Sequence, residues 1–188
     1  MNLVDRVKNI LVSPKTEWPV IAAETTDIKS MYMNYIMILA AIPAIAGIIG
    51  SMFGGFMTSF IGVAVLQYVM ALVTVFIAAL VVDALAPTFG GTKNPVAALE
   101  LVAYSMTASW VAGIALVLGL RIGGVIHAIG SLYGIYLLYL GLPVMMKCPQ
   151  EKVVPYLVVT VVVLILLSWV LGVLLAGAIF APMMLIGR

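Results

Sequence analysis

Five long apolar runs constrain the fold of this chain more than any other feature. The chain has 188 residues, of which 65% are hydrophobic and only 9% are charged, whereas a soluble domain carries roughly 25% charged residues. A helix needs about 20 consecutive apolar residues to cross the hydrocarbon core of a bilayer. We therefore expect an all-α polytopic membrane protein, a bundle of five transmembrane helices over residues 34–50, 59–85, 96–120, 122–146 and 155–182.

Short breaks separate these runs, so neighbouring spans are expected to be antiparallel. Backbone groups in lipid must form their hydrogen bonds within the protein, which leaves helices and closed barrels as the spanning structures. A barrel strand alternates apolar and polar residues, and residues 158–167 do not alternate in this way. The pattern therefore favours helices.

The first 30 residues differ from the rest and are expected to form a separate cytoplasmic or interfacial segment before the membrane domain at 31–188. Leu3, Val7, Ile10 and Leu11 recur on one helical face, and Pro14 ends that helix. Such amphipathic helices lie along lipid headgroups, although a partly ordered tail fits the pattern equally well. Aromatic residues are enriched at the membrane interface, so the expected anchors are Trp18, Tyr32 and Tyr35.

The distribution of Lys and Arg predicts how the chain is threaded. With five spans, one side holds seven of these residues, namely Arg6, Lys8, Lys15, Lys29, Lys93, Lys147 and Lys152, and the other holds Arg121 and Arg188. Cytoplasmic loops carry the excess of positive charge. We expect a cytoplasmic N-terminus, a C-terminus outside, and a location in a bacterial cytoplasmic (inner) membrane.

Two acidic residues fall inside expected spans, where charged side chains are candidates for a functional site. Asp83 lies four residues before Pro87, and Glu100 lies five residues after Pro95. Both are about a turn and a half inside the cytoplasmic boundary, on helices joined by one loop that contains Lys93. They are a candidate cation or proton site; the alternative is that both face cytoplasmic water with Lys93 as a neutralising partner.

Other polar side chains are expected within the spans and need hydrogen-bond partners there. Hydroxyl and amide groups join transmembrane helices, and lining a hydrated passage is the alternative role. This expected polar cluster comprises Gln67, Tyr104, Thr107, Tyr133, Tyr136 and Tyr139.

Small residues in the fourth span predict close helix packing. Gly130 and Gly134 are four residues apart, and Gly141 follows on the same face. Such spacing allows two helices to approach closely, within one chain or in a homo-oligomer.

The sequence contains no recognisable catalytic or metal-binding motif. The chain has one His and one Cys, and it lacks HExxH, GxSxG and phosphate-binding Gly-rich motifs. We expect no enzyme activity, no metal and no cofactor. The formal net charge of +2 gives no basis for nucleic-acid binding.

Several segments resemble bacterial members of the Yip1 family. They are RVKNIL at 6–11, SPKTEW at 13–18, GGTKNP at 90–95, VAYS at 102–105 and YGIYLLYLGL at 133–142. The resemblance implies a five-span membrane domain with a cytoplasmic N-terminus. Eukaryotic relatives act in vesicle traffic and contact small GTPases, but their Asp-Leu-Tyr-Gly-Pro segment is missing here, and Ala108 replaces a common proline.

Two functions are therefore expected to compete. The first is a non-enzymatic, membrane-organising scaffold whose partners are the lipid bilayer, a homo-oligomer, or a protein recruited by the N-terminal segment. The second is a small carrier or channel for a cation or proton that uses Asp83 and Glu100.

Overall fold

The computed structural model describes residues 2–52 and 57–186, and these residues form helices and no strand. Arg188, one of the two positive residues expected outside, lies beyond the described residues. In chain order the elements are α1 Leu3–Val12, α2 Pro14–Ala23, α3 Ile28–Met31, the π-helical turn η1 Tyr32–Ile36, α4 Met37–Met52, α5 Met57–Leu85, the 3₁₀ turn η2 Ala86–Phe89, α6 Pro95–Ala112, the 3₁₀ turn η3 Gly113–Leu118, α7 Leu120–Met145 and α8 Gln150–Ile186.

Five of the described helical segments are long and apolar enough to cross a membrane, which confirms the all-α, five-span fold. They cover Ile28–Met52, Ile61–Phe89, Pro95–Leu118, Leu120–Met145 and Gln150–Val170. The first begins earlier than expected because α3 and η1 continue into α4. The fifth also begins earlier, because Pro155 lies inside α8 and does not start it. Proline has no N–H to donate to the carbonyl four residues before it, which here belongs to Glu151. Glu151 is exposed, so water can bond that carbonyl.

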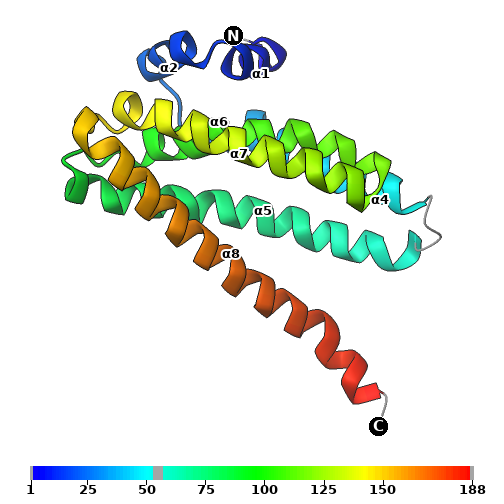
Figure 1. The fold of residues 1–188 in the computed structure, drawn as a ribbon. Coiled ribbons are helices and arrows are strands. Elements are labelled where there is room, and N and C mark those ends of the chain that lie inside the picture. The colour runs from blue at the N-terminus through cyan, green and yellow to red at the C-terminus, as the bar shows by residue number, and fades with distance from the viewer. Residues whose placement is uncertain (1, 53–56, 187–188) are drawn as a thin grey trace.

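Helix α6 is the most buried element, and α7 packs closely along it (Figure 1). A Cβ at Gly130 would lie 2.7 Å from the carbonyl oxygen of Ala108, and one at Gly134 would lie 2.7 Å from that of Ser105. A Cβ at Gly141 would lie 2.7 Å from the Trp18 ring. Gly130 and Gly134 therefore lie where α7 meets the backbone of α6, and Gly141 leaves room for the Trp18 ring of α2.

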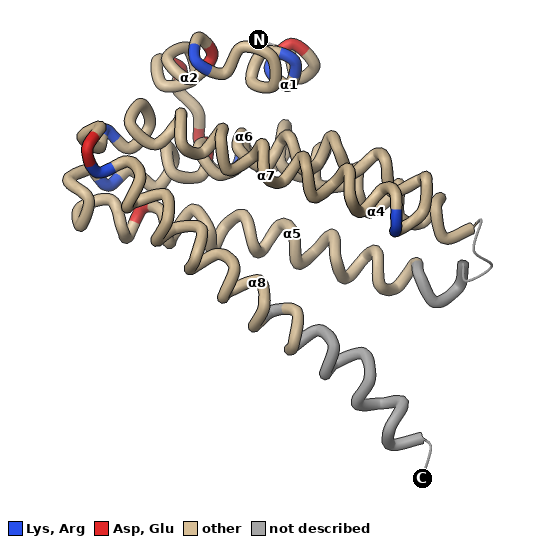
Figure 2. The backbone as a smooth tube through the Cα atoms, viewed as in Figure 1, with Lys and Arg blue, Asp and Glu red and all other residues tan. Residues whose placement is uncertain are grey.

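The α5–α6 and α7–α8 connections meet at one end of the bundle. The Thr92 N–H donates to the Met146 carbonyl at 2.9 Å, and a Cβ at Gly91 would lie 2.7 Å from the same oxygen. Gly90 has a φ of 74°, a left-handed conformation that glycine adopts without strain. Charged residues gather at this end (Figure 2), so both loops belong to the same side of the membrane.

Helices α1 and α2 lie along the flank of α6 and α7, beside the bundle (Figure 1). Ile10 and Ile21 are fully buried there, so the apolar face of α1 packs on the protein itself. The Tyr133 hydroxyl donates to the Leu11 carbonyl at 2.8 Å. Tyr133 lies twelve residues before the end of α7 at Met145, about 18 Å along the helix, so the end of α1 lies well along the span.

Candidate functional site

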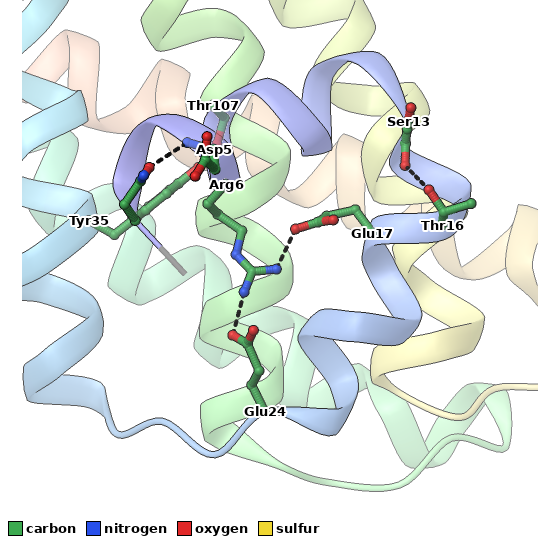
Figure 3. Close-up of polar contacts among 9 residues, drawn as sticks. Asp5, Arg6, Ser13, Thr16, Glu17, Glu24, Tyr35 and Thr107 are labelled. Atoms are coloured by element: carbon green, nitrogen blue, oxygen red, sulfur yellow. Dashed lines mark hydrogen bonds and ion pairs between the residues drawn. The ribbon is translucent and has the colours of Figure 1, made fainter.

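Arg6 is the centre of a buried polar site between the N-terminal helices and α6 (Figure 3). The residue is 4% exposed. Its Nη1 donates to Glu17 Oε1 at 2.5 Å, and its Nη2 donates to Glu24 Oε2. Burial alone would lower the pKa of Arg6, but the hydrogen bond to Glu24 and nearby negative groups outweigh it and raise that pKa. A charged guanidinium therefore ties α1 to α2 and to the residue that follows it.

Aromatic rings join this ion-pair centre to the membrane helices. The Arg6 Cζ lies 5.7 Å from the centroid of the Tyr104 ring, which is within range of a cation–π interaction. The Tyr104 ring meets those of Trp18 and Tyr35 edge-on, with centroids 6.3 and 4.7 Å away. The hydroxyl of Tyr35 forms a 2.7 Å hydrogen bond with Thr107 Oγ1. The N-terminal helices are thus fastened to α6 and to η1.

Glu100 adds a third carboxylate to the same site. It lies on α6, is 6% exposed, and interacts electrostatically with Glu24 and Arg6. Together with Glu17, three carboxylates lie near one guanidinium, and two of them, Glu17 and Glu24, form ion pairs with it. Because buried charge without a partner is costly, this arrangement favours a further proton or cation.

Asp83 points to a different part of the protein. It is half-buried on α5, its Oδ1 has no hydrogen-bond partner among the described residues, and it interacts electrostatically with Tyr156 of α8. The Tyr156 hydroxyl donates to the Val82 carbonyl, and its ring stacks on Phe89 at 4.9 Å between centroids. Asp83 therefore belongs to the α5–α8 contact.

The three residues of the predicted ion site form no ion pair with one another among the described residues. Lys93 is exposed in the α5–α6 connection, and the described residues show no ion pair between it and Asp83 or Glu100. The structure groups Glu100 with Arg6 and Glu24 instead.

The expected polar cluster is also divided. Tyr104 and Thr107 lie together through Tyr35, as described above. Gln67 lies on α5, on the wall of a separate cavity.

The tyrosines of α7 contribute less to this site than their spacing suggested. Tyr133 bonds to α1, and its ring lies 5.6 Å from that of Tyr136. Tyr136 and Tyr139 are 41% and 37% exposed. These two side chains therefore face the surroundings of the bundle.

Two of the three expected interface anchors are buried in the protein. Trp18 is fully buried and Tyr35 is 5% exposed. Tyr32 is half-buried, and its hydroxyl donates to the Leu72 carbonyl at 3.0 Å. These rings hold helices together within the chain.

Sequence reasoning missed the roles of Arg6, Glu17 and Glu24. The signal was their helical spacing. Arg6 is four residues before buried Ile10, and Glu17 is four residues before buried Ile21, and residues at that spacing share a helical face. A charged residue in line with the apolar face predicts a buried ion pair.

The chemistry available here is electrostatic. Among residues 2–52 and 57–186, no group of three or more His, Cys, Asp and Glu side chains is placed to hold a metal ion. The site holds acidic groups around one cation, next to aromatic rings. Its ion pairs join α1 to α2 and to Glu24, and its ring contacts join the N-terminal helices to α6.

Comparison with known protein families matches the Yip1 domain to residues 8–172, which is most of the chain. Comparisons with curated proteins and with solved structures gave no match. The family match spans the second half of α1, all elements from α2 to α7 and the first part of α8, and it agrees with the five membrane-spanning helices. This chain is an integral membrane protein that belongs to the Yip1 family.

Proposed function

We propose that this protein is a non-enzymatic, membrane-organising scaffold that holds α1 and α2 as a rigid unit in the cytoplasmic leaflet. The observation that carries this proposal is the Arg6 site. Its ion pairs to Glu17 and Glu24 join the two helices to each other, and its contact with Tyr104 joins them to the flank of the membrane domain.

The outer face of the unit has the composition of a lipid-binding surface. Val4 and Val12 are 72% and 73% exposed, and Lys8 and Lys15 are exposed as well. Residues 4, 8 and 12 follow at helical spacing, so they share one face. Apolar side chains on such a face contact acyl chains, and the long Lys side chains between them extend towards anionic headgroups.

The orientation is part of the proposal. Seven of the nine Lys and Arg residues fall on the side of the N-terminus and of the two joined loops, which by the positive-inside rule is cytoplasmic. The location would be a bacterial cytoplasmic membrane. Two additional helices in that leaflet would enlarge the cross-section of the protein there. A homo-oligomer or a protein recruited by the outer face of α1 would extend the scaffold.

Reconstitution into anionic liposomes tests the scaffold. The wild-type protein should shift the diameter distribution seen by electron cryomicroscopy towards smaller vesicles, and Val4→Ser with Val12→Ser should abolish most of the shift. A matched control is Val65→Ser with Val69→Ser, which alters two exposed valines on α5. Equal reshaping by wild type and the α1 variant would contradict the proposal. Deleting residues 1–30 is less informative, because it would remove Trp18 and expose the core residues that pack against it, such as Tyr104.

A cation or proton carrier is the second candidate, and the excess of buried carboxylates around Arg6 favours it. Glu100 would bind the transported ion, and Asp83 would act separately on the α8 side. Proton flux in proteoliposomes, followed with an enclosed pH dye, should fall in Glu100→Gln and separately in Asp83→Asn, while Lys93→Gln serves as an exposed control. Absence of flux in the wild type, or unchanged flux in both variants, would remove this candidate.

A further inference from the structure

A cavity of about 760 Å³ lies inside the membrane domain, between α4, α5, α6, α7 and α8. Ligand pockets commonly measure about 300–1,000 Å³, so its size suits a bound molecule. None of the residues of the Arg6 site lines it. No Asp, Glu, Lys or Arg lines its described wall either, so an uncharged ligand fits best.

Ser105 supplies an unused hydrogen-bonding group on the wall of this cavity. The residue is 5% exposed, and its buried Oγ has no partner among the described residues. Buried hydroxyls in proteins are normally hydrogen-bonded. The Ser105 hydroxyl is therefore available to a ligand that carries an acceptor oxygen.

A hydrogen-bonded trio lies one turn further along the cavity wall. Ser131 Oγ donates its proton to the His127 carbonyl at 3.0 Å. A serine hydroxyl has a single proton to donate, and that of Ser131 is already used. In the 3.0 Å hydrogen bond between the Ser109 and Ser131 hydroxyls, the donor is therefore Ser109. The Ser109 Oγ then accepts from His127 Nε2 at 3.1 Å. In the neutral ring this leaves Nδ1 as an acceptor, so the wall offers both a donor and an acceptor.

Helix α8 forms the side of the cavity that borders the lipid. Tyr156 and Thr160 are fully buried, whereas Ile165 and Trp169 are 61% and 69% exposed. The helix leaves the bundle along its length (Figure 1). Ile165 lines the cavity and is also exposed, so the cavity is adjacent to the acyl-chain region of the bilayer.

We propose that this cavity binds a neutral lipid, a hydrocarbon chain that carries an uncharged hydroxyl or carbonyl oxygen, with that oxygen accepting from Ser105. The lining of the cavity selects this class. No charged side chain on its described wall could pair with a headgroup phosphate, and the Ser105 hydroxyl offers a hydrogen bond to an uncharged oxygen. A phospholipid carries a charged phosphate, whereas every oxygen atom of a diacylglycerol is uncharged.

Photo-crosslinking with a defined probe tests this site. The probe is a diacylglycerol with a diazirine in one acyl chain, added to proteoliposomes of the purified full-length protein, and crosslinked peptides are mapped by mass spectrometry. The wild type should be labelled on the parts of α6 and α7 that line the cavity. A phosphatidylglycerol with the same diazirine chain is the second probe. Equal labelling of these segments by both probes would overturn the assignment to a neutral lipid.

A cavity-filling variant has a close matched control. Gly124 lines the cavity, and a Cβ placed there meets no atom within 4 Å, as at Gly62 on the exposed face of α5. Gly124→Leu should reduce cavity labelling at least tenfold, and Gly62→Leu should leave it unchanged. Undiminished labelling in Gly124→Leu would show that the probe binds only around the protein and would overturn the proposal.

Ser105→Ala provides a test that does not fill the cavity. Loss of one hydrogen bond should raise the probe concentration for half-maximal labelling roughly three- to tenfold. Ser51→Ala, which removes a hydroxyl bonded only to its own helix at Ile48, should not change it. An unchanged half-maximal concentration in Ser105→Ala would contradict the role of this hydroxyl. The readout does not involve α1 or vesicle shape, so its outcome is independent of the proposed scaffold function.

Discussion

At the scale of single residues, the N-terminal site depends on Arg6 more than on any carboxylate around it. Arg6 is the one basic residue in the site. Its side chain is 5% exposed, whereas the side chains of Glu17 and Glu24 are 7% and 44% exposed. Removing one member of a buried ion pair leaves the other charged and unpaired. The position of each charge, rather than the number of charges, determines how stable the docked N-terminal helices are.

Arg6→Met should therefore destabilise the protein by about 3 kcal/mol, because Glu17 would remain buried without a partner. Adding Glu17→Met should recover a large part of this loss, since two apolar side chains of similar size replace the pair. The measurement is thermal unfolding in detergent, with exposed Lys8→Met as the control. Destabilisation in the double variant as great as in the single one would contradict this account.

The free thiol of Cys148 should react slowly and at a higher pH than an exposed thiol. Cys148 is 5% exposed between α7 and α8, and burial raises its pKa above the ordinary value. Because the thiolate is the reactive form, maleimide labelling should rise to its half-point above about pH 8.5. The stability contributed by the neutral thiol is present below the unfolded pKa and is lost as the pH rises through the folded pKa.

An exposed cysteine gives the control for this pH dependence. Lys93→Cys in a Cys148→Ser background places a thiol on the exposed loop at the same end of the bundle. Its labelling should reach the half-point at a lower pH than that of Cys148. The same half-point for both would be inconsistent with burial of Cys148.

At the scale of elements, the contact between α6 and α7 depends on glycine. The Gly134 Cα lies so close to α6 that a methyl group there would meet the Ser105 carbonyl at 2.7 Å, and backbone cannot move aside as a flexible side chain can. A methyl group at Gly62 on α5 would meet no atom within 4 Å. Identical substitutions at these two positions therefore differ only in the contact they disturb.

Gly134→Ala should destabilise the bundle by about 1–3 kcal/mol because the added methyl group overpacks the α6–α7 contact. Gly62→Ala should be neutral or slightly stabilising, because alanine favours the helix by about 1 kcal/mol. Thermal unfolding of both variants in the same detergent checks this. If the two variants unfolded at the same temperature, the helix contact would not depend on this glycine.

At the scale of the whole molecule, charge asymmetry and connectivity define two different ends. The α5–α6 and α7–α8 loops, which contain Lys93 and Lys147, are joined by the Thr92–Met146 hydrogen bond, and Lys152 follows in the first turn of α8. The α6–α7 turn at the opposite end is followed by Arg121. This asymmetry is the basis of the proposed orientation.

Cysteine labelling in intact cells tests that orientation. In a Cys148→Ser background, Arg121→Cys should react with a membrane-impermeant maleimide added from outside, because this exposed position faces outward in the proposed threading. Lys93→Cys should react only after the membrane is permeabilised. The reverse pattern would show that the N-terminus lies outside the cytoplasm.

Elements that depend on local composition were predictable. The five spans follow from runs of apolar residues, and the start of α6 follows from Asn94 and Pro95, since the Asn94 side chain accepts from the Ala97 N–H at 3.1 Å. The starts of the first and fifth spans were predicted less well, because a π-helical turn and an internal proline both continue a helix where the sequence alone indicates a start. The division of Asp83 and Glu100 between separate partners was not predictable from their matched depth.

The amino-acid sequence by itself determined that this protein lies in a lipid bilayer, that it is helical and how many spans it has. The reason is that the free energy of transferring each side chain into hydrocarbon is a local property, and these free energies sum along the chain. Only the tertiary structure decided that Arg6 joins Glu17, Glu24 and Tyr104, that Trp18 is buried, and that Ser105 borders a cavity. Such contacts depend on how each helix is rotated about its axis against neighbours far away in the chain, and packing, rather than hydropathy, sets that rotation.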